Sequence, residues 1–199
     1  MGYHFAETPA AQGAPLVMTF HGTGGDETQF HAAARQMRPG AWVISPRGDV
    51  SEMGMNRYFR RTGEGVYDMA DLARRVTAMA GFVSDAKARA GAIRVFGVGY
   101  SNGANILAAV AFEYPDLFTD LALMHPLIPW QPEPQPRLKG RRVLITAGQR
   151  DPICPAPMTQ ALADWFTAQG AAPEMIWHPG GHEIANTEIE ALTGFLKED

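Results

Sequence analysis

The sequence has little cysteine: Cys154 is the only one among 199 residues. One cysteine cannot form an internal disulfide, so a packed core has to stabilise the fold. A chain of this length buries roughly 70% of the surface that its unfolded form exposes, which is enough to fold without disulfides or structural metals. The scarcity of cysteine is also typical of proteins from reducing compartments.

Long apolar runs and an excess of positive charge are missing as well. The first residues, MGYHFAETPAAQG, contain no apolar core of the kind found in secretory signals, and no later run suggests a membrane span. The formal net charge is −4, whereas binding to phosphates requires clustered positive charge. We therefore expect a soluble, cytoplasmic protein that has no membrane span and does not bind nucleic acid.

The sequence does have short apolar runs that alternate with longer amphipathic segments. Buried parallel strands read as near-continuous apolar runs, and their alternation with helices is typical of α/β folds. The pattern predicts a single α/β domain over residues 1–199, with a mostly parallel central sheet of about seven strands and helices on both faces. The expected strands are YHFAE at an edge, PLVMTF, WVISP, IRVFGV, DLALM, RVLITAG and EMIWH.

Apolar residues at helical spacing predict three amphipathic helices, which include residues 69–83, 158–166 and 189–196. Residues 104–112 are apolar on almost every side, as in a helix that is buried against a sheet. Two segments fit neither pattern, because residues 46–65 are polar and glycine-punctuated, and residues 125–140 contain five prolines. Loops of this length in a compact domain are often functional.

The segment VFGVGYSNGANIL has a glycine two residues before Ser101 and another two residues after it. This G-x-S-x-G pattern lies between an expected strand and an expected helix, where a nucleophilic serine can occupy a strained turn. Gly99 and Gly103 would avoid clashes beside that turn. The alternatives are an ordinary turn and a phosphate-binding loop. The phosphate loop is disfavoured because Asn102 replaces its third glycine and the sequence has no Walker lysine.

A serine nucleophile needs a base, and the base needs an acid that orients it. Asp151 shortly follows the apolar run RVLITAG, and His182 lies in a glycine turn after the last expected strand. They follow Ser101 in the order acid, then histidine, that accompanies this motif. We predict Ser101 as nucleophile, His182 as general base and then acid, and Asp151 as the orienting acid. The alternative role for Asp151 is a helix cap.

The turn HGTGGDE, after the first buried strand, is expected to contribute to an oxyanion hole. We predict that the backbone N–H groups of Thr23 and Asn102 are the donors and that His21 braces the turn. His178 and His182 are a candidate metal pair, but the Pro-Gly-Gly between them prevents helical spacing and no third ligand is evident in the sequence. We expect neither a metal nor a cofactor.

Taken together, these motifs resemble the serine hydrolases of the α/β-hydrolase fold. More narrowly, HGTGGDE, SPRGDVSEMGMNRYFRR, GVGYSNGANI, AGQRDPICP and GGHE are similar to the phospholipase/carboxylesterase family, close to acyl-protein thioesterases and dienelactone hydrolases. The resemblance runs from about Pro15 to the end, and PRGDVSEMGMNRYFRR looks like the small bacterial carboxylesterase branch. It implies hydrolysis of short-chain esters or thioesters without a cofactor. Asn102 departs from the glutamine usual in acyl-protein thioesterases.

The expected function is that of a serine carboxylesterase, which hydrolyses short- to medium-chain or compact aromatic esters through an acyl-enzyme. An acyl thioesterase or lysophospholipase, or a dienelactone-type hydrolase, would use the same triad. An inactive pseudo-hydrolase that only binds a ligand is the alternative from another class. The expected partner is a small-molecule ester, and the expected assembly is a monomer or homodimer.

Larger members of the fold carry a helical lid, and residues 125–140 are too short and too rich in proline to form one. The pocket walls are therefore expected from this segment and from residues 46–65. Arg57 or Arg60 could bind a carboxylate or phenolate, and the alternative is a solvated loop with two aromatic anchors. We expect His125 to be a packed strand-end residue and Cys154 to be inert. The candidate substrate-binding residues are Arg57, Phe59, Arg60, Leu127, Ile128 and Trp130.

Overall fold

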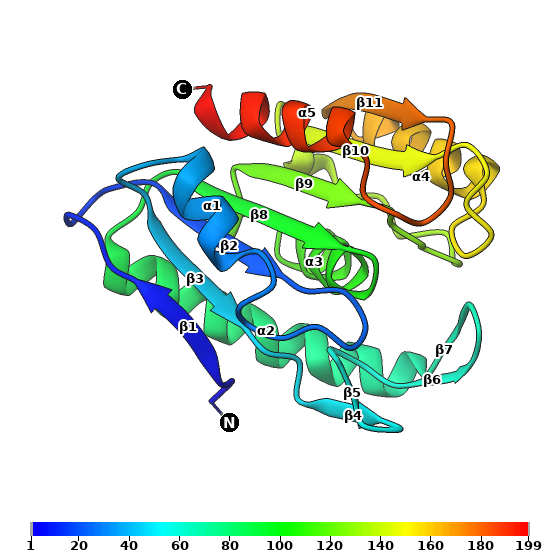
Figure 1. Cartoon of the computed structure of the whole chain (residues 1–199), viewed down its shortest axis with the longest axis horizontal. Coiled ribbons are helices and arrows are strands. Elements are labelled where there is room, and N and C mark those ends of the chain that lie inside the picture. Colours follow the sequence, from blue (N-terminus) through cyan, green and yellow to red (C-terminus); the bar gives the residue numbers. More distant parts are fainter. Residues whose placement is uncertain (1, 199) are drawn as a thin grey trace.

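The computed structural model describes residues 2–198. Its centre is a seven-stranded sheet with the strand order β1-β3-β2-β8-β9-β10-β11 (Figure 1). The first strand pairs antiparallel with β3, and all the other neighbours pair in parallel. The strands are β1 (Phe5–Thr8), β2 (Leu16–Phe20), β3 (Trp42–Pro46), β8 (Val95–Tyr100), β9 (Asp120–Met124), β10 (Arg142–Gly148) and β11 (Ala172–His178).

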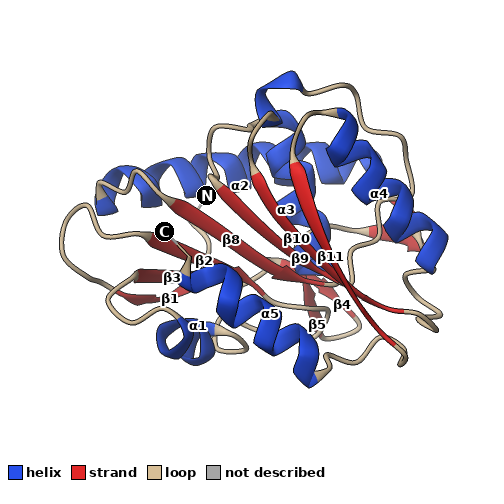
Figure 2. Ribbon diagram, turned by 90° about the horizontal axis from the view of Figure 1, so that it is seen from above, coloured by secondary structure: helices blue, strands red, loops and turns tan. Residues whose placement is uncertain are grey.

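Helices cover both faces of this sheet (Figure 2). Three of them, α2 (Met69–Ala90), α3 (Asn102–Glu113) and α4 (Ala156–Ala168), lie on one face, and α1 (His31–Met37) and α5 (Asn186–Lys197) lie on the other. Each face has its own cluster of buried apolar side chains. The expected α/β-hydrolase architecture, with helices on both faces of a mostly parallel sheet, is confirmed.

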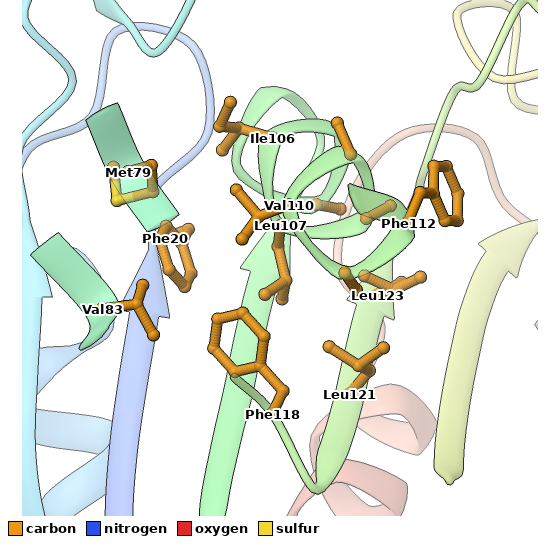
Figure 3. Packing of buried hydrophobic residues seen from close by; sticks show 14 of the residues in the cluster. Phe20, Met79, Val83, Ile106, Leu107, Val110, Phe112, Phe118, Leu121 and Leu123 are labelled. Atoms are coloured by element: carbon orange, nitrogen blue, oxygen red, sulfur yellow. The ribbon is translucent and has the colours of Figure 1, made fainter. Parts of the chain in front are cut away.

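The helix α3 is buried almost completely, as its apolar sequence predicts. Every residue from Asn102 to Phe112 is buried, because α3 packs between the sheet and α2. Figure 3 shows Leu107 and Val110 of this helix close to Phe118 and Leu123 at the sheet. This burial fixes the amino-terminal end of α3, and therefore the turn that contains Ser101, against the carboxyl edge of the sheet.

The segment over residues 46–65 is more ordered than its polar composition predicts. It forms two small hairpins, β4 (Val50–Glu52) with β5 (Met55–Arg57), and β6 (Arg61–Gly63) with β7 (Val66–Tyr67). Between them, Tyr58 and Phe59 are fully buried. The Tyr58 hydroxyl donates to the carbonyl of Pro46 at 2.8 Å and accepts from the N–H of His21 at 3.1 Å. These two aromatic residues anchor both hairpins to the domain.

The proline-rich segment between β9 and β10 behaves as expected. Within the described chain its helical structure is limited to a 3-10 turn, η1 (Pro136–Leu138), so it forms no helical lid. The short helix α1 has no clear periodic signal in the sequence and was not predicted. No helix among residues 2–198 is long and apolar enough to cross a membrane.

Candidate active site

Ser101 occupies the turn between β8 and α3 in a strained backbone conformation. Its φ is 52° and its ψ is −117°, a backbone conformation that residues other than glycine rarely adopt. Such a conformation costs on the order of 1–3 kcal/mol, so the surrounding structure has to enforce it. The Ser101 N–H donates to the carbonyl of Met124 at 2.8 Å, which ties the turn to the end of β9.

Close backbone packing explains the two glycines of the motif. A Cβ atom on Gly99 would lie 2.6 Å from the carbonyl oxygen of Gly103. A Cβ atom on Gly103 would lie 2.2 Å from the carbonyl oxygen of Phe20 and 2.5 Å from that of His21. All three distances are too short for a Cβ atom at either position. Gly99 therefore allows the serine turn to close on itself, and Gly103 allows it to pack directly against the end of β2.

The structure brings Ser101, His182 and Asp151 into one hydrogen-bonded chain. The Nε2 atom of His182 lies 2.9 Å from the Ser101 Oγ atom, and its Nδ1 atom lies 2.7 Å from Oδ2 of Asp151. An ionised carboxylate can only accept, so Nδ1 carries the proton and Nε2 is free to accept the proton of Ser101. The loops after three separate strands, β8, β10 and β11, supply these residues.

Asp151 is buried, with a side chain that accepts from four groups. Its Oδ1 atom accepts from the backbone N–H groups of Ile153 and Cys154 at 2.8 and 2.9 Å. Its Oδ2 atom faces His182 and His125. Burial alone would raise the pKa of Asp151, but hydrogen bonds from Cys154 and the two histidines outweigh it and lower the pKa. The carboxylate therefore contacts both the turn before α4 and the imidazole of His182.

The loop that carries His182 is held by Tyr100. The Tyr100 hydroxyl donates to the His182 carbonyl at 2.6 Å, and the two rings lie 5.4 Å apart in a tilted arrangement. The loop also contacts the end of β10 very closely, since a Cβ atom on Gly148 would lie 1.9 Å from the carbonyl oxygen of Gly181. These contacts fix the imidazole relative to the serine turn.

Thr23 and Asn102 both line the cavity beside Ser101. Asn102 is the first residue of α3, where backbone N–H groups have no partner within the helix and the helix dipole favours negative charge. The turn that carries Thr23 is braced by His21, whose Nε2 accepts from Gly48 N–H at 2.9 Å while Nδ1 lies 2.7 Å from the Gly22 carbonyl. Burial lowers the pKa of His21, as suits a neutral ring.

The side chain of Asn102 has a structural function that sequence reasoning missed. Its Oδ1 atom accepts from the backbone N–H of Tyr58 at 2.8 Å. This bond connects the serine turn to the segment between the two hairpins. The sequence predicts a role for the backbone N–H of Asn102, and this side-chain bond is a separate contribution.

A cavity of about 270 Å³ opens beside Ser101 and His182. Of the six candidate substrate-binding residues, only Arg57 and Leu127 line it. The other four lie elsewhere, which corrects the expected pocket. Phe59 is fully buried and packs against Tyr67, Arg60 is exposed, and Ile128 and Trp130 line a groove on the α4 side. Lining residues that the sequence did not reveal are Arg61, Glu64, Gly65, Tyr67, Tyr100, Asn105, Ile153 and Cys154.

Arg57 is a buried cation in the wall of this cavity. It donates to the Thr23 hydroxyl at 2.8 Å, and its Nε atom lies 3.1 Å from a carboxylate oxygen of Glu52. Arg61 shares the same carboxylate at 2.9 Å. Burial and the charge of Arg61 lower the pKa of Arg57, but a guanidinium remains charged at any ordinary pH. Two cations thus share one carboxylate in this wall.

Behind Asp151 lies a second histidine cluster, which sequence reasoning did not connect to the site. The fully buried His125 directs Nδ1 at Oδ2 of Asp151 at 2.8 Å and Nε2 at Oε1 of Glu188 at 3.1 Å. The Nε2 atom of His178 lies 3.3 Å from the other oxygen of Glu188. The available signal was topological: β9 and β10 are adjacent and parallel, so His125 and Asp151 leave the sheet at the same edge.

The distances within this cluster would suit a metal, since ligand-type atoms of His125, His178 and Glu188 lie within 4.8 Å of one another. The hydrogen bonds of the cluster indicate that a proton, and not a metal ion, lies between His178 and Glu188. The N–H of Gly180 donates to Nδ1 of His178 at 3.1 Å, so this ring carries its proton on Nε2, the atom that faces Glu188. A metal ligand would need that nitrogen unprotonated. We therefore treat the cluster as a set of proton-mediated contacts.

The strand order, the strained serine turn and the chain from serine to histidine to carboxylate define the class: this is an ester hydrolase of the α/β-hydrolase fold. The chain belongs to the dienelactone hydrolase family, whose family model matches residues 2–193. The expected resemblance to ester hydrolases of this group is confirmed.

Similar proteins agree with this assignment. MhqD of Bacillus subtilis (strain 168) is 36% identical over 185 residues, which cover 92% of each chain. A carboxylesterase from Bacillus cereus has 32% identity and a TM-score of 0.89, over 98% of this chain and 93% of its own. Atu2452 from Agrobacterium tumefaciens str. C58, a protein of unknown function, has 52% identity and a TM-score of 0.92, over 98% of this chain and 95% of its own.

Proposed function

We propose that this hydrolase is a serine carboxylesterase, in which Ser101 is the nucleophile, His182 the general base and Asp151 the acid that orients it. The observation that carries the proposal is the hydrogen-bonded chain of 2.9 and 2.7 Å from Oγ of Ser101 through His182 to Asp151. A serine hydroxyl becomes a useful nucleophile when a positioned base can take its proton.

The reaction follows from these contacts. Nε2 of His182 takes the hydroxyl proton while Oγ of Ser101 attacks the ester carbonyl carbon. The negative charge that develops on the carbonyl oxygen is stabilised by the N–H groups of Thr23 and Asn102. Protonated His182 then donates to the leaving alcohol as its bond to carbon breaks, which leaves an acyl-enzyme. A water molecule, deprotonated by His182, hydrolyses the acyl-enzyme and restores Ser101.

The cavity supports a compact substrate. Its volume of about 270 Å³ lies just below the range of about 300–1,000 Å³ that is usual for drug-sized ligands. The proline-rich segment between β9 and β10 supplies Leu127 to the wall but no helix that would cover a long acyl chain. Short- to medium-chain or compact aromatic esters therefore fit best, with a thioester or a lactone as the other substrates that the same triad could open.

The test is a series of p-nitrophenyl esters from acetate to palmitate, with matched thioesters and a lactone, combined with labelling by a serine-directed fluorophosphonate. We expect kcat/KM to be highest for the short and aromatic esters, and the label to be found on Ser101. Labelling at another residue would refute the nucleophile. A preference for palmitate or for thioesters would refute the substrate class and leave the nucleophile unaffected.

Arg57 favours, more specifically, an ester that carries a carboxylate. The reason is that the guanidinium groups of Arg57 and Arg61 share one carboxylate, that of Glu52, so their two positive charges face one negative charge. The other acid that lines the cavity, Glu64, is exposed to solvent. We predict that Arg57→Gln raises KM for a half-ester of a dicarboxylic acid about tenfold more than for the matched neutral ester, which is equivalent to roughly 1.4 kcal/mol.

The comparison with a neutral ester is needed because Arg57 also holds the Thr23 hydroxyl. Loss of that bond would lower the rate for both substrates, whereas loss of charge recognition affects only the acidic one. Arg60→Gln is the matched control, since Arg60 is exposed and does not line the cavity. Equal increases in KM for the acidic and the neutral ester would show that Arg57 is only a structural residue.

A further inference from the structure

His125 has an arrangement that ordinary core packing does not explain. Its side chain has no exposure to solvent, and both of its ring nitrogens face carboxylates, Asp151 at 2.8 Å and Glu188 at 3.1 Å. The side chains of these two acids are also fully buried. A buried polar cluster of this kind is costly unless its charges are balanced and its hydrogen bonds are made.

Counting protons fixes the charge of His125. Asp151 is ionised, because it accepts from two backbone N–H groups and from His182, so Nδ1 of His125 has to carry a proton. Glu188 accepts from the Thr146 hydroxyl and from the backbone N–H of Ala185 at 2.6 Å, as an ionised carboxylate does. Nε2 of His125 faces this carboxylate and therefore carries a proton as well.

The contact between His125 and Glu188 is an ion pair rather than a directed hydrogen bond. The distance of 3.1 Å is within ion-pair range, but the Nε2 atom does not meet the angular requirements of a hydrogen bond. Electrostatic attraction does not depend on such an angle. Burial would lower the pKa of His125, but its contacts with Glu188 and Asp151 outweigh burial and raise the pKa.

The backbone of His125 shows that this placement is enforced. Its φ is 50°, an uncommon value for a residue with a side chain, and its N–H donates to the Thr146 carbonyl at 2.8 Å. The Cys154 thiol lies 3.2 Å from the carbonyl oxygen of His125. Strain of this kind persists where the surrounding structure requires one position of a side chain. Here the required position lies between the two acids.

From this geometry, and resting on the roles proposed above for Ser101, Asp151 and His182, we propose that His125 is a positioning residue. As an imidazolium between Asp151 and Glu188, it holds Asp151 ionised and offsets part of its negative charge. His182 therefore faces a partly balanced set of charges, which favours the neutral imidazole that can accept the serine proton.

The surroundings of the His125 ring are consistent with this role. The ring lies 5.1 Å from that of His182, 5.5 Å from that of His178 and 5.7 Å from that of Tyr100. None of these neighbours carries a negative charge at neutral pH. The charges in direct contact with His125 are therefore those of the two acids, and the set of Asp151, His125 and Glu188 has a net charge of −1.

The experiment measures the pH dependence of kcat/KM for the wild type, His125→Gln, Glu188→Gln and the double variant. His125→Gln changes the net charge of the set from −1 to −2, which favours protonated His182, so the acidic limb of the pH profile should move up by about one pH unit. Glu188→Gln makes the set neutral and should move the acidic limb down. The double variant restores a net charge of −1 and should return the limb close to its wild-type position.

A purely structural role would not produce shifts of opposite sign that cancel in the double variant. His4→Gln is the control, since its side chain is 68% exposed and lies away from the cluster. The proposal is overturned if the two single variants move the limb in the same direction, if either leaves it in place, or if the double variant does not reverse the shift. Stoichiometric metal in the purified wild-type protein would also overturn it.

A second measurement does not depend on the folding of any variant. In the wild type labelled with ¹⁵N-histidine, one histidine should have protons on both ring nitrogens from about pH 5 to pH 8, while an unperturbed histidine titrates near pH 6.5. A neutral ring at His125 above pH 7 would overturn the proposal. If Ser101→Ala keeps its activity, the proposed function fails. If activity depends on Ser101 but the limb does not shift, only the role of His125 fails.

Discussion

Ser101→Ala is expected to lower kcat for p-nitrophenyl acetate by about 10⁶-fold. The physical reason is that the hydroxyl is the only group that His182 can deprotonate for attack in this chain of hydrogen bonds, through the 2.9 Å contact between its Nε2 atom and Oγ. Removing it leaves the proposed oxyanion donors, Thr23 and Asn102, and the binding cavity intact, so a weak residual rate above that of water should remain. Steady-state kinetics and fluorophosphonate labelling measure both quantities.

The fold should tolerate this change. Alanine removes one partly buried hydrogen bond, which is worth about 1 kcal/mol, and leaves the backbone strain at φ 52° in place. The melting temperature should therefore change by only a few degrees. Ser84→Ala, at an exposed position of α2, is the matched control and should leave both activity and stability unchanged. Substantial turnover by folded Ser101→Ala would refute the serine mechanism.

The sheet was predictable because each central strand is buried on both faces. Runs such as LVMTF and DLALM are buried at every position, so they need no alternation of polar and apolar residues and stand out in the sequence. The hairpins over residues 50–67 could not be predicted in this way. They are short and polar, and they are held in place by Tyr58 and Phe59, which lie between the hairpins and are buried in the core. Such tertiary anchoring leaves no local pattern.

The three residues of the predicted triad could be selected because each follows a buried strand, and parallel strands end at one edge of the sheet. The same rule applies to His125 at the end of β9, but a histidine there was interpreted as packing because nothing local reveals a partner. The role of Glu188 is even harder to predict, since acids are common in the first turn of a helix, where the helix dipole stabilises negative charge. Their pairing depends on α5 crossing behind β10.

The pocket walls were predicted less well, for a related reason. Arg57 and Leu127 line the cavity, whereas Phe59 and Trp130 do not and pack against Tyr67. An aromatic residue near a catalytic loop has the same sequence signal whether it faces the substrate or the core. In this protein the core takes Phe59, which is fully buried, and the polar residues that flank it, Arg57 and Arg61, form the cavity wall.

Gly103→Ala should have the second large effect, this time on folding as well as activity. The new methyl group would lie 2.2 Å from the carbonyl oxygen of Phe20 and 2.5 Å from that of His21, both backbone atoms that cannot rotate away. We expect a loss of about 3 kcal/mol or more in the free energy of unfolding, measured by urea titration. Kinetics on the folded fraction should show a fall in kcat/KM of about 100-fold, because the serine turn has to move relative to the turn that carries Thr23.

Gly81→Ala is the control that separates the clash from the general effect of replacing a glycine. Gly81 lies in the middle of α2, and apart from its chain neighbours and the nearby backbone of α2 no atom would lie within 4 Å of its new methyl group. Alanine there should stabilise the protein by about 0.5–1 kcal/mol, because glycine is a poor helix former, and should not alter kcat/KM. If Gly103→Ala were as stable and as active as Gly81→Ala, the close packing of the serine turn against β2 could not be what fixes the nucleophile. If it were stable but inactive, that packing would serve the position of Ser101 more than the stability of the domain.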